Sequence, residues 1–178
     1  MKQSRIDNVI KKMKENNLKQ IIVTSTASIY YLTGKWISSG ERMIALYLNI
    51  DGKHKFIVNK LFPIEGNIGI DIVWYTDNDD PISVLGSIVE KNEELGVDKF
   101  WPAHFLIKLM NINIISKFVN SSDVIDELRM RKDEEEKELM RKSSQINDKV
   151  MERFWKEIKE GYTCLLYTSP SPRDTERS

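Results

Sequence analysis

The sequence predicts an α/β fold in which a mixed β-sheet is flanked by helices on both faces and is followed by one long helix. Three observations support this prediction. Short apolar runs alternate along the chain with apolar residues that recur every three or four positions. An Asp-Gly pair separates two strand-like segments, and a helix-start signal precedes the longest amphipathic stretch. With 178 residues and 40% hydrophobic content, the chain can bury one core.

The first elements follow from periodicity. Apolar residues spaced three and four apart predict a helix over residues 6–13 that ends at Asn16-Asn17, and the apolar run 21–23 predicts a short buried strand. Residues 29–32 predict a short helix that Gly34 ends, and a loop follows it. The order helix, strand, helix is typical of the start of an α/β domain.

A hairpin is the clearest local prediction. Strands over residues 43–50 and 55–59 flank Asp51-Gly52, a pair that suits the positive φ angles of a tight hairpin turn. The remaining elements are predicted by short apolar runs and helical spacing. They are a strand over 70–75, a helix over 82–92, a strand over 97–98, a helix over 103–110 and a strand or strand end over 113–118.

A charged junction over residues 126–146 precedes the long helix. Asp133 suits the N-cap position, and Glu136 stands three residues later as the returning half of a capping box. Apolar positions then share one face, at Leu139, Ser143, Ile146, Val150, Phe154 and Ile158, with Met140, Met151 and Trp155 beside them. We expect this face to need a partner surface, while the charges mainly solvate the other side.

Composition excludes several partners. The formal net charge is zero, so we expect no nucleic-acid and no membrane partner. No apolar run approaches the roughly 18 residues of a membrane span, and no signal peptide precedes Ile6. The single cysteine, Cys164, lies near the end of the chain, which leaves no disulfide to form. A cytoplasmic protein is expected.

Residues able to carry chemistry are few. His54 and His104 are far apart in sequence and have no partner at metal-ligand spacing, so we expect each to be structural or exposed. The acidic run 77–80 lacks the glycine and terminal glutamate of a calcium loop, and a polar turn that caps the helix after Pro81 is the better interpretation. The sequence offers no phosphate-binding glycine loop and no Gly-x-Ser-x-Gly motif.

Three segments together resemble one family. Residues 28–34, Ser-Ile-Tyr-Tyr-Leu-Thr-Gly, are similar to its Asn-Ile-x-Tyr-Leu-Thr-Gly signature, with Ser28 in the Asn position. The run 96–98, Gly-Val-Asp, with Phe105 and Leu109 after it, resembles the second half of the same domain. Residues 128–144 resemble the linker pattern Leu-Arg-x-x-Lys-Ser-x-x-Glu-Ile, which is followed by a basic residue and a small pair. The family is creatinase/prolidase, the two-domain "pita-bread" metallopeptidases that include Xaa-Pro aminopeptidases and prolidases.

The linker resemblance contains two replacements. Asp133 stands in the position of the usual Ser, which preserves an N-cap, and Ser143-Ser144 replaces the usual Ala pair. Arg129 and Lys132 match the basic residues of the pattern, and we expect them to bridge the domains by pairing with carbonyls or carboxylates.

The resemblance implies a fold like the creatinase N-terminal domain, which is RNase H-like, and a non-catalytic role. The full-length protein would be a metal-dependent Xaa-Pro dipeptidase or aminopeptidase that hydrolyses peptide bonds preceding proline. Its two divalent metal ions, Mn, Co or Zn, would lie in a catalytic domain missing from this chain. We therefore expect this chain to hold no cofactor and to be inactive alone. A proline-containing peptide would be the substrate, and a homodimer the full-length assembly.

Two alternatives remain open at the level of sequence. A metal-free, creatinase-like amidinohydrolase would keep the fold and change the reaction. A non-enzymatic peptide-binding or oligomerisation module of the same fold would have lost the metal ligands. Recovery of the downstream coding sequence separates these readings, because two Asp, one His and two Glu in family order would support the peptidase.

One loop is a candidate for substrate contact. In relatives, the N-terminal domain commonly reaches the active site of the neighbouring subunit. Residues 34–42 carry two glycines, an aromatic ring and a guanidinium group, which suit closure over a peptide and its carboxylate. Trp36 and Arg42 are therefore predicted to bind substrate in trans. The alternative is that Trp36 packs only on its own domain.

The predicted organisation has three parts. Residues 1–125 form the N-terminal domain, 126–163 form the linker and the first helix of a truncated catalytic domain, and 164–178 form a tail. The tail back-translates into the end of a common transposase-based sequencing adapter, so we expect it to be foreign; a native Ser/Pro-rich disordered tail is the alternative. Residues 161–163 resemble the start of the family's Gly-x-Thr-Glu segment.

Overall fold

A computed structural model of the chain describes residues 2–38, 40–158 and 160–161. The chain divides into two units, residues 1–131 and residues 132–178, which are described separately below. The predicted tail 164–178 with Cys164, and most of the predicted Gly-x-Thr segment, lie outside the described residues.

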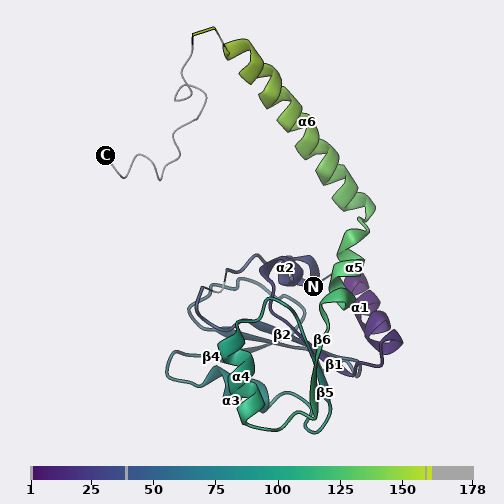
Figure 1. Cartoon of the computed structure of the whole chain (residues 1–178), viewed down its shortest axis with the longest axis vertical. Helices are drawn as coiled ribbons and strands as arrows, with labels where there is room; N and C mark the ends of the chain where they lie inside the picture. Colours follow the sequence, from purple (N-terminus) through teal and green to yellow (C-terminus); the bar gives the residue numbers. More distant parts are fainter. Residues whose placement is uncertain (1, 39, 159, 162–178) are drawn as a thin grey trace. The chain divides into compact units, whose positions relative to one another are not determined.

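The first unit contains one six-stranded sheet in the order β4-β3-β2-β1-β5-β6 (Figure 1). β1 pairs antiparallel with β2, and β2 with β3, while the other neighbouring pairs are parallel. The strands are β1 Gln20–Val23, β2 Ala45–Asn49, β3 Lys55–Asn59, β4 Asp71–Tyr75, β5 Glu94–Val97 and β6 Lys117–Asn120. The predicted mixed sheet is confirmed.

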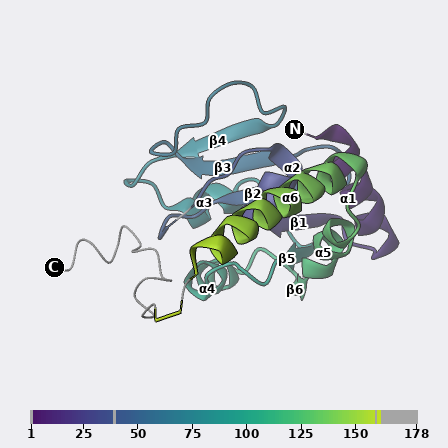
Figure 2. The ribbon, with the colours of Figure 1, turned by 90° about the horizontal axis from the view of Figure 1, so that it is seen from above.

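Helices cover both faces of this sheet. The helices of the first unit are α1 Gln3–Glu15, α2 Thr26–Thr33, α3 Pro81–Gly86, α4 Ala103–Asn111 and α5 Ser122–Met130. α1, α2 and α5 pack on one face and α3 and α4 on the other, as the core residues and Figures 1 and 2 show. In β1, Ile21 and Val23 face the first group while Ile22 faces the second, as the two-residue period of a strand requires.

Local sequence signals explain most element ends. The Gly34 backbone adopts a left-handed conformation with φ 75°, and its N–H donates to the Tyr30 carbonyl to end α2. In the hairpin, Gly52 has φ 81°, a conformation that side-chain-bearing residues rarely adopt. Asp80 caps α3 by accepting a hydrogen bond from the backbone N–H of Ser83, with Pro81 as the first helical residue.

Three predicted elements need correction. β5 is Glu94–Val97, so it begins three residues before the predicted strand 97–98 and ends before Asp98. α3 ends at Gly86 instead of Asn92, because glycine is a poor helix former and the chain turns there, with the Ile88 and Val89 N–H groups both donating to the Leu85 carbonyl. The last strand starts at Lys117, four residues later than predicted, because Asn113 (φ 50°) closes the turn after α4. Residues 114 and 115 are apolar because they pack in the core, although they lie outside the strand.

α5 was not predicted, because its residues were interpreted as part of a charged junction. Val124 and Ile125 are buried and Leu128 packs against them, which gives the helical spacing that the sequence contained. The predicted boundary after residue 125 falls inside α5, whereas the structural division follows Arg131. The buried face of α5 makes it part of the first unit.

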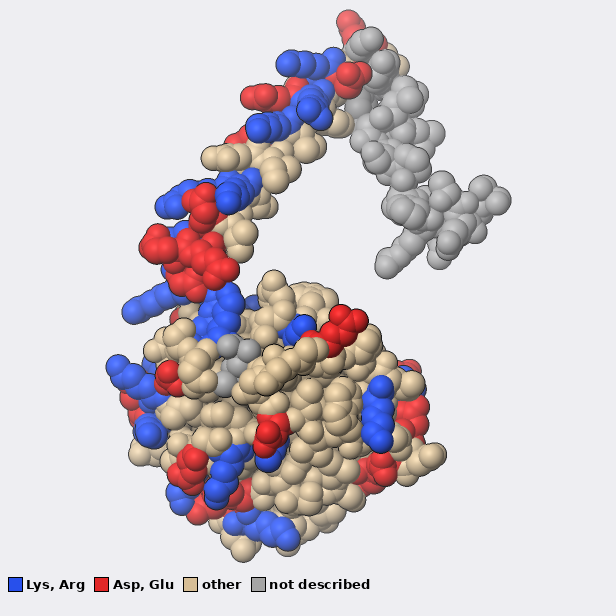
Figure 3. All heavy atoms as spheres, turned by 180° about the vertical axis from the view of Figure 1, so that it is seen from behind, with Lys and Arg blue, Asp and Glu red and all other residues tan. Residues whose placement is uncertain are grey.

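The second unit contains α6, Glu134–Glu157. The predicted capping box is confirmed: Asp133 Oδ1 accepts from the Glu136 N–H at 2.9 Å, and Glu136 Oε2 accepts from the Asp133 N–H at 3.1 Å. Figure 3 shows acidic and basic side chains mixed along one side of α6 and uncharged side chains along another. None of the described helices combines the length and apolar character that a bilayer span requires.

Candidate functional site

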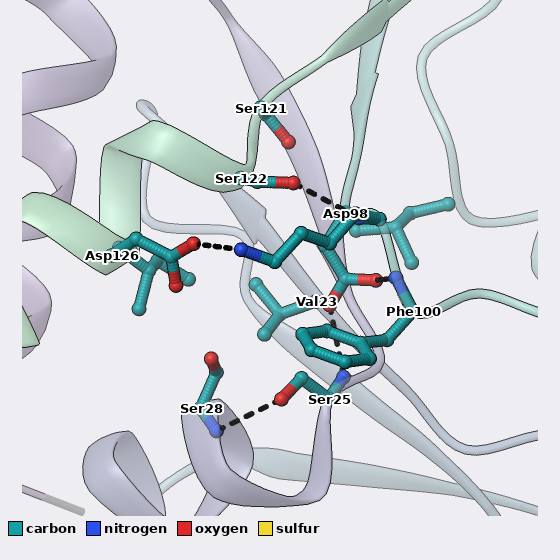
Figure 4. A pocket seen from close by; sticks show the side chains of 11 residues that line it. Val23, Ser25, Ser28, Asp98, Phe100, Ser121, Ser122 and Asp126 are labelled. Atoms are coloured by element: carbon teal, nitrogen blue, oxygen red, sulfur yellow. Dashed lines mark hydrogen bonds and ion pairs between the residues drawn. The ribbon is translucent and has the colours of Figure 1, made fainter.

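Within the first unit, one residue from each of the three segments that resemble one family lies near the carboxyl ends of β1 and β5. These residues are Ser28, Asp98 and Arg129. Asp98 follows β5 and accepts four hydrogen bonds, from the Thr24 N–H (2.6 Å), the Thr24 hydroxyl (2.5 Å), the Ser25 N–H (2.9 Å) and the Phe100 N–H (3.1 Å). Both oxygens of the carboxylate are therefore engaged (Figure 4). Asp98 fixes the turn between β1 and α2 against the end of β5.

Gly96 lies in β5 between β1 and β6. A Cβ atom added there would lie 2.7 Å from Ile21 Cγ2 and 2.7 Å from Ser121 Cβ. Real Cβ atoms essentially never approach heavy atoms within 3.0 Å. The absence of a side chain at residue 96 therefore allows the chain entering α5 to pack closely on the sheet.

Charged side chains join α5 to this centre. Lys99 Nζ pairs with Asp126 Oδ2 at 2.5 Å, and Asp126 Oδ1 lies 3.7 Å from Arg129 Nη1. Arg129 Nη1 also donates to the Ser28 hydroxyl of α2 at 3.3 Å. The Arg of the linker pattern thus contacts the Ser that occupies the Asn position of the α2 signature, within the first unit.

The cavity at this centre is too small for a substrate. Its lining includes the serines at positions 25, 28, 121 and 122, together with Asp98 and Phe100 (Figure 4). The free volume is about 10 Å³, which is near the minimum for a single water molecule. We interpret this cluster as the structural centre of the domain.

The predicted substrate residues lie apart from this centre. Trp36 is 67% exposed, and its ring makes an edge contact with Tyr30 at a centroid distance of 5.8 Å. Tyr30 was not predicted, although the sequence places it six residues earlier on α2. The two rings form an exposed aromatic pair on the domain surface. In the part of the chain that the structure describes, the Trp36 ring contacts Tyr30 and the Arg42 guanidinium contacts Asp77.

Arg42 is held by an acidic partner. Its Nε and Nη2 atoms donate to the two oxygens of Asp77 at 2.9 and 2.7 Å, and the Asn59 side chain donates to the same carboxylate at 2.8 Å. The hydrogen bonds from Arg42 keep the pKa of Asp77 below its ordinary value. A substrate carboxylate at Arg42 would have to share the guanidinium with Asp77.

The acidic run that includes Asp77 is a polar turn, as predicted. Asp79 accepts from the Thr76 N–H and hydroxyl, each at 2.7 Å, and Asp80 caps α3. The side-chain hydrogen bond from Ser83 is the main cause of the lowered pKa of Asp80. Asp77, Asp79 and Asp80 thus each accept hydrogen bonds from neighbouring side chains or backbone groups.

The two histidines do not meet. His54 Nδ1 accepts from the Asn49 N–H at 3.3 Å, whereas the His104 ring packs on Phe105 with centroids 3.9 Å apart. Across residues 2–38, 40–158 and 160–161, no three His, Cys, Asp or Glu side chains come together in a way that could hold a metal ion. The described part of this chain does not fit a dinuclear metal centre.

Burial gives His54 a testable pH dependence. Burial lowers the pKa of the His54 imidazole below the ordinary 6.5, although the negative charge of Asp7 acts to raise it. The neutral ring, which can accept from Asn49, is favoured in the folded state. Its contribution to stability is present above the unfolded pKa and is lost as the pH falls through the folded pKa. We expect NMR titration to give His54 a pKa below that of the chemically unfolded chain; an equal or higher value contradicts the burial argument.

Comparisons with known proteins agree with the fold. The model of the creatinase/prolidase N-terminal domain matches residues 5–131, which is most of the chain. This chain belongs to the creatinase/prolidase N-terminal domain family. The matched range ends where the first structural unit ends and includes α5, so this creatinase/prolidase domain extends six residues beyond the predicted boundary.

Relatives of the domain are peptidases. An uncharacterized peptidase of Staphylococcus aureus (strain bovine RF122 / ET3-1) is 28% identical over 167 residues, which cover 90% of this chain and 46% of that protein. A second S. aureus protein, the uncharacterized peptidase of strain USA300, is 28% identical over 171 residues with the same coverage. The chain thus spans about half the length of the curated relatives it matches.

Solved structures have the same fold. A dipeptidase from Pyrococcus horikoshii OT3 superimposes with a TM-score of 0.76 at 27% identity, covering 86% of this chain and 44% of that one. A prolidase from Thermococcus sibiricus gives 0.77 at 25% identity, with 92% and 46% coverage. The separate creatinase/prolidase N-terminal domain of an X-Pro dipeptidase from Streptococcus pyogenes, at 16% identity, gives 0.59 and covers 69% and 97%.

Proposed function

We propose that this chain is the non-catalytic N-terminal domain of a metal-dependent Xaa-Pro dipeptidase or aminopeptidase. The observation that carries the proposal is the match of residues 5–131 to a creatinase/prolidase N-terminal domain, with peptidases among the relatives. The full-length protein would hydrolyse the amide bond preceding proline in a peptide. It would act as a cytoplasmic homodimer.

Metal ions belong to the part of the full-length protein that these residues do not supply. The described side chains form no candidate metal cluster, and His54 and His104 have separate surroundings. Two divalent ions, Mn, Co or Zn, would therefore be held by other residues of the full-length protein, where they would supply Lewis-acid chemistry. The role of this domain would be to position the substrate.

The exposed aromatic pair is the best candidate for substrate contact. Trp36 and Tyr30 are 67% and 50% exposed, and their ring faces can pack against a proline ring. Arg42 carries a guanidinium group that can bind a substrate carboxylate. Its two hydrogen bonds to Asp77 also hold the loop in place. We therefore propose that Trp36 contributes more to substrate affinity than Arg42, from one subunit to the active site of its partner.

The proposal has a direct kinetic test. The purified 178-residue chain with Mn²⁺, Co²⁺ or Zn²⁺ is expected to leave an Ala-Pro dipeptide intact. In the full-length enzyme, Trp36→Ala is expected to raise KM for the dipeptide by about tenfold, as for an aromatic contact worth about 1.4 kcal/mol.

Trp74→Ala is the matched control, because Trp74 is an exposed tryptophan on β4, distant in sequence from the loop. Hydrolysis by the isolated chain would disprove the non-catalytic role. Unaltered KM and kcat in both Trp36→Ala and Arg42→Ala would disprove the substrate contact. A full-length protein that hydrolyses creatine and spares Ala-Pro would favour the amidinohydrolase.

A further inference from the structure

The ends of β3 and β4 hold the end of the loop that precedes β2. The Tyr75 hydroxyl, at the end of β4, donates to the Met43 carbonyl at 2.8 Å. Arg42 Nε and Nη2 donate to the two oxygens of Asp77, and the Asn59 side chain at the end of β3 donates to the same carboxylate. Met43 is buried, so the backbone next to Arg42 is also anchored. The guanidinium and the carboxylate are therefore held together at this end of the sheet.

Asp77 accepts hydrogen bonds from only part of the Arg42 guanidinium. An arginine side chain has five N–H donors, and Asp77 accepts one from Nε and one from Nη2. The Arg42 side chain is 43% exposed and the Asp77 side chain 55% exposed, so the N–H groups of Nη1 are left for an acceptor on another molecule. The pair thus still offers hydrogen-bond donors, although its positive charge is already balanced by a negative one.

Acidic groups outnumber basic groups around Arg42. The hydrogen bonds from Arg42 keep the pKa of Asp77 below its ordinary value, so Asp77 is ionised at neutral pH. The pKa of Arg42 is raised mainly by the hydrogen bond to Asp77, and the charge of Glu41 acts in the same direction. The turn after β4 also carries Asp79, which interacts electrostatically with Lys60. Three carboxylates therefore accompany two cationic groups.

A carboxylate and a neutral carbonyl would respond differently to this pair. Either group can accept a hydrogen bond from Arg42 Nη1, but the carboxylate would also lie close to the negative charge of Asp77. Like charges at such short distances repel one another even in water. A neutral carbonyl would gain the hydrogen bond without this repulsion. The pair therefore favours an uncharged acceptor over a charged one.

We propose that Asp77 is a specificity-determining residue, which disfavours a free substrate carboxylate beside Arg42 and favours peptides that continue past proline. The inference rests on the proposed function, in which this loop reaches the substrate. It names the substrate class of that site: in a tripeptide or longer peptide the proline carbonyl is part of a neutral amide, whereas an Xaa-Pro dipeptide ends there in a carboxylate.

The ratio of kcat/KM for Ala-Pro to kcat/KM for Ala-Pro-amide, measured in the full-length enzyme, tests this. A general loss of activity cancels in the ratio. Asp77→Asn is expected to raise the ratio about fivefold and Arg42→Gln to lower it about fivefold, because the two changes alter the net charge of the pair in opposite directions. The double variant has a neutral pair again, and its ratio should lie within about twofold of the wild-type value.

Asp71→Asn is the matched control. Asp71 also pairs with a base, since Lys55 Nζ lies 2.9 Å from its carboxylate, but it is the first residue of β4, whereas Asp77 follows the end of that strand. A strand of five residues is about 17 Å long, which exceeds the screening length of about 8 Å at physiological ionic strength. The control should leave the ratio within about twofold of the wild-type value.

Three outcomes would overturn the inference. Equal ratios in the wild type, Asp77→Asn and Arg42→Gln overturn it alone, even where Trp36→Ala raises KM and so supports the substrate contact. Shifts of the same sign in the two single variants also overturn it, because a purely structural effect does not depend on the sign of the charge. An enzyme that hydrolyses neither substrate overturns the proposed function, and the inference with it.

Discussion

Replacing Gly96 by alanine is expected to destabilise the first unit by about 1–3 kcal/mol, the range for added volume in a well-packed core. The new methyl group would lie 2.7 Å from both Ile21 Cγ2 and Ser121 Cβ. Neither neighbour is the free end of a long side chain, because one branches at the Cβ of a core strand and the other is a Cβ itself. Relief therefore requires movement of β1 or of the entry to α5.

Urea unfolding monitored by circular dichroism measures this change. Gly86→Ala is the control, because its methyl group would meet only the flexible ends of Ile112 (3.0 Å) and Ile114 (3.3 Å). We expect the control to cost clearly less than Gly96→Ala. A double-mutant cycle with Ser121→Gly should show coupling, since that change removes one of the two clashing groups. Equal midpoints for Gly96→Ala and the wild type would contradict the close approach.

Replacing Asp98 by alanine is expected to cost about 2–4 kcal/mol, because a carboxylate that accepts four hydrogen bonds is removed. Three of the donors are backbone N–H groups, which cannot turn away to find other partners without a change in the turn. Asp98→Asn should cost less, because the amide oxygen still accepts while its NH₂ group can donate to the Thr24 hydroxyl.

Asp126→Ala is the control for the loss of a charge near the same centre. Its pair with Lys99 is short, but the Lys99 side chain is 53% and the Asp126 side chain 29% exposed, so we expect an effect below about 1 kcal/mol. The measurement is again the free energy of unfolding, with hydrogen exchange of the Thr24, Ser25 and Phe100 amides as a local readout. Equal losses for Asp98→Ala and Asp126→Ala would reject the special role of Asp98.

Most of the secondary structure could be predicted from local patterns. The helix at α1, the hairpin around Gly52 and the capping box at Asp133 each depend on residues within a few positions of one another. One error occurred where apolar residues pack in the core without belonging to a regular element, and another where the charged residues of α5 obscured its helical spacing. Residues 114 and 115 lie in a loop and pack against the core. Their apolar character predicted a strand from residue 113, whereas β6 begins at Lys117.

The candidate site was less predictable. The sequence marked Trp36 and Arg42 by residue type, but it could not show that Trp36 pairs with Tyr30 or that Arg42 is held by Asp77, which is 35 residues away. Whether the two residues contact substrate stays a prediction.

The sequence by itself determined the fold class, the family resemblance and the start of the long helix, because periodicity, turn residues and caps are local properties. The long-range contacts made by residues of those family segments became visible only in the tertiary structure. Gly96, Asp98 and Arg129 each act on residues more than 20 positions away, through a close approach, a set of hydrogen bonds and a contact between helices. Such contacts depend on which strands become neighbours in the sheet, and that order is a property of the whole domain.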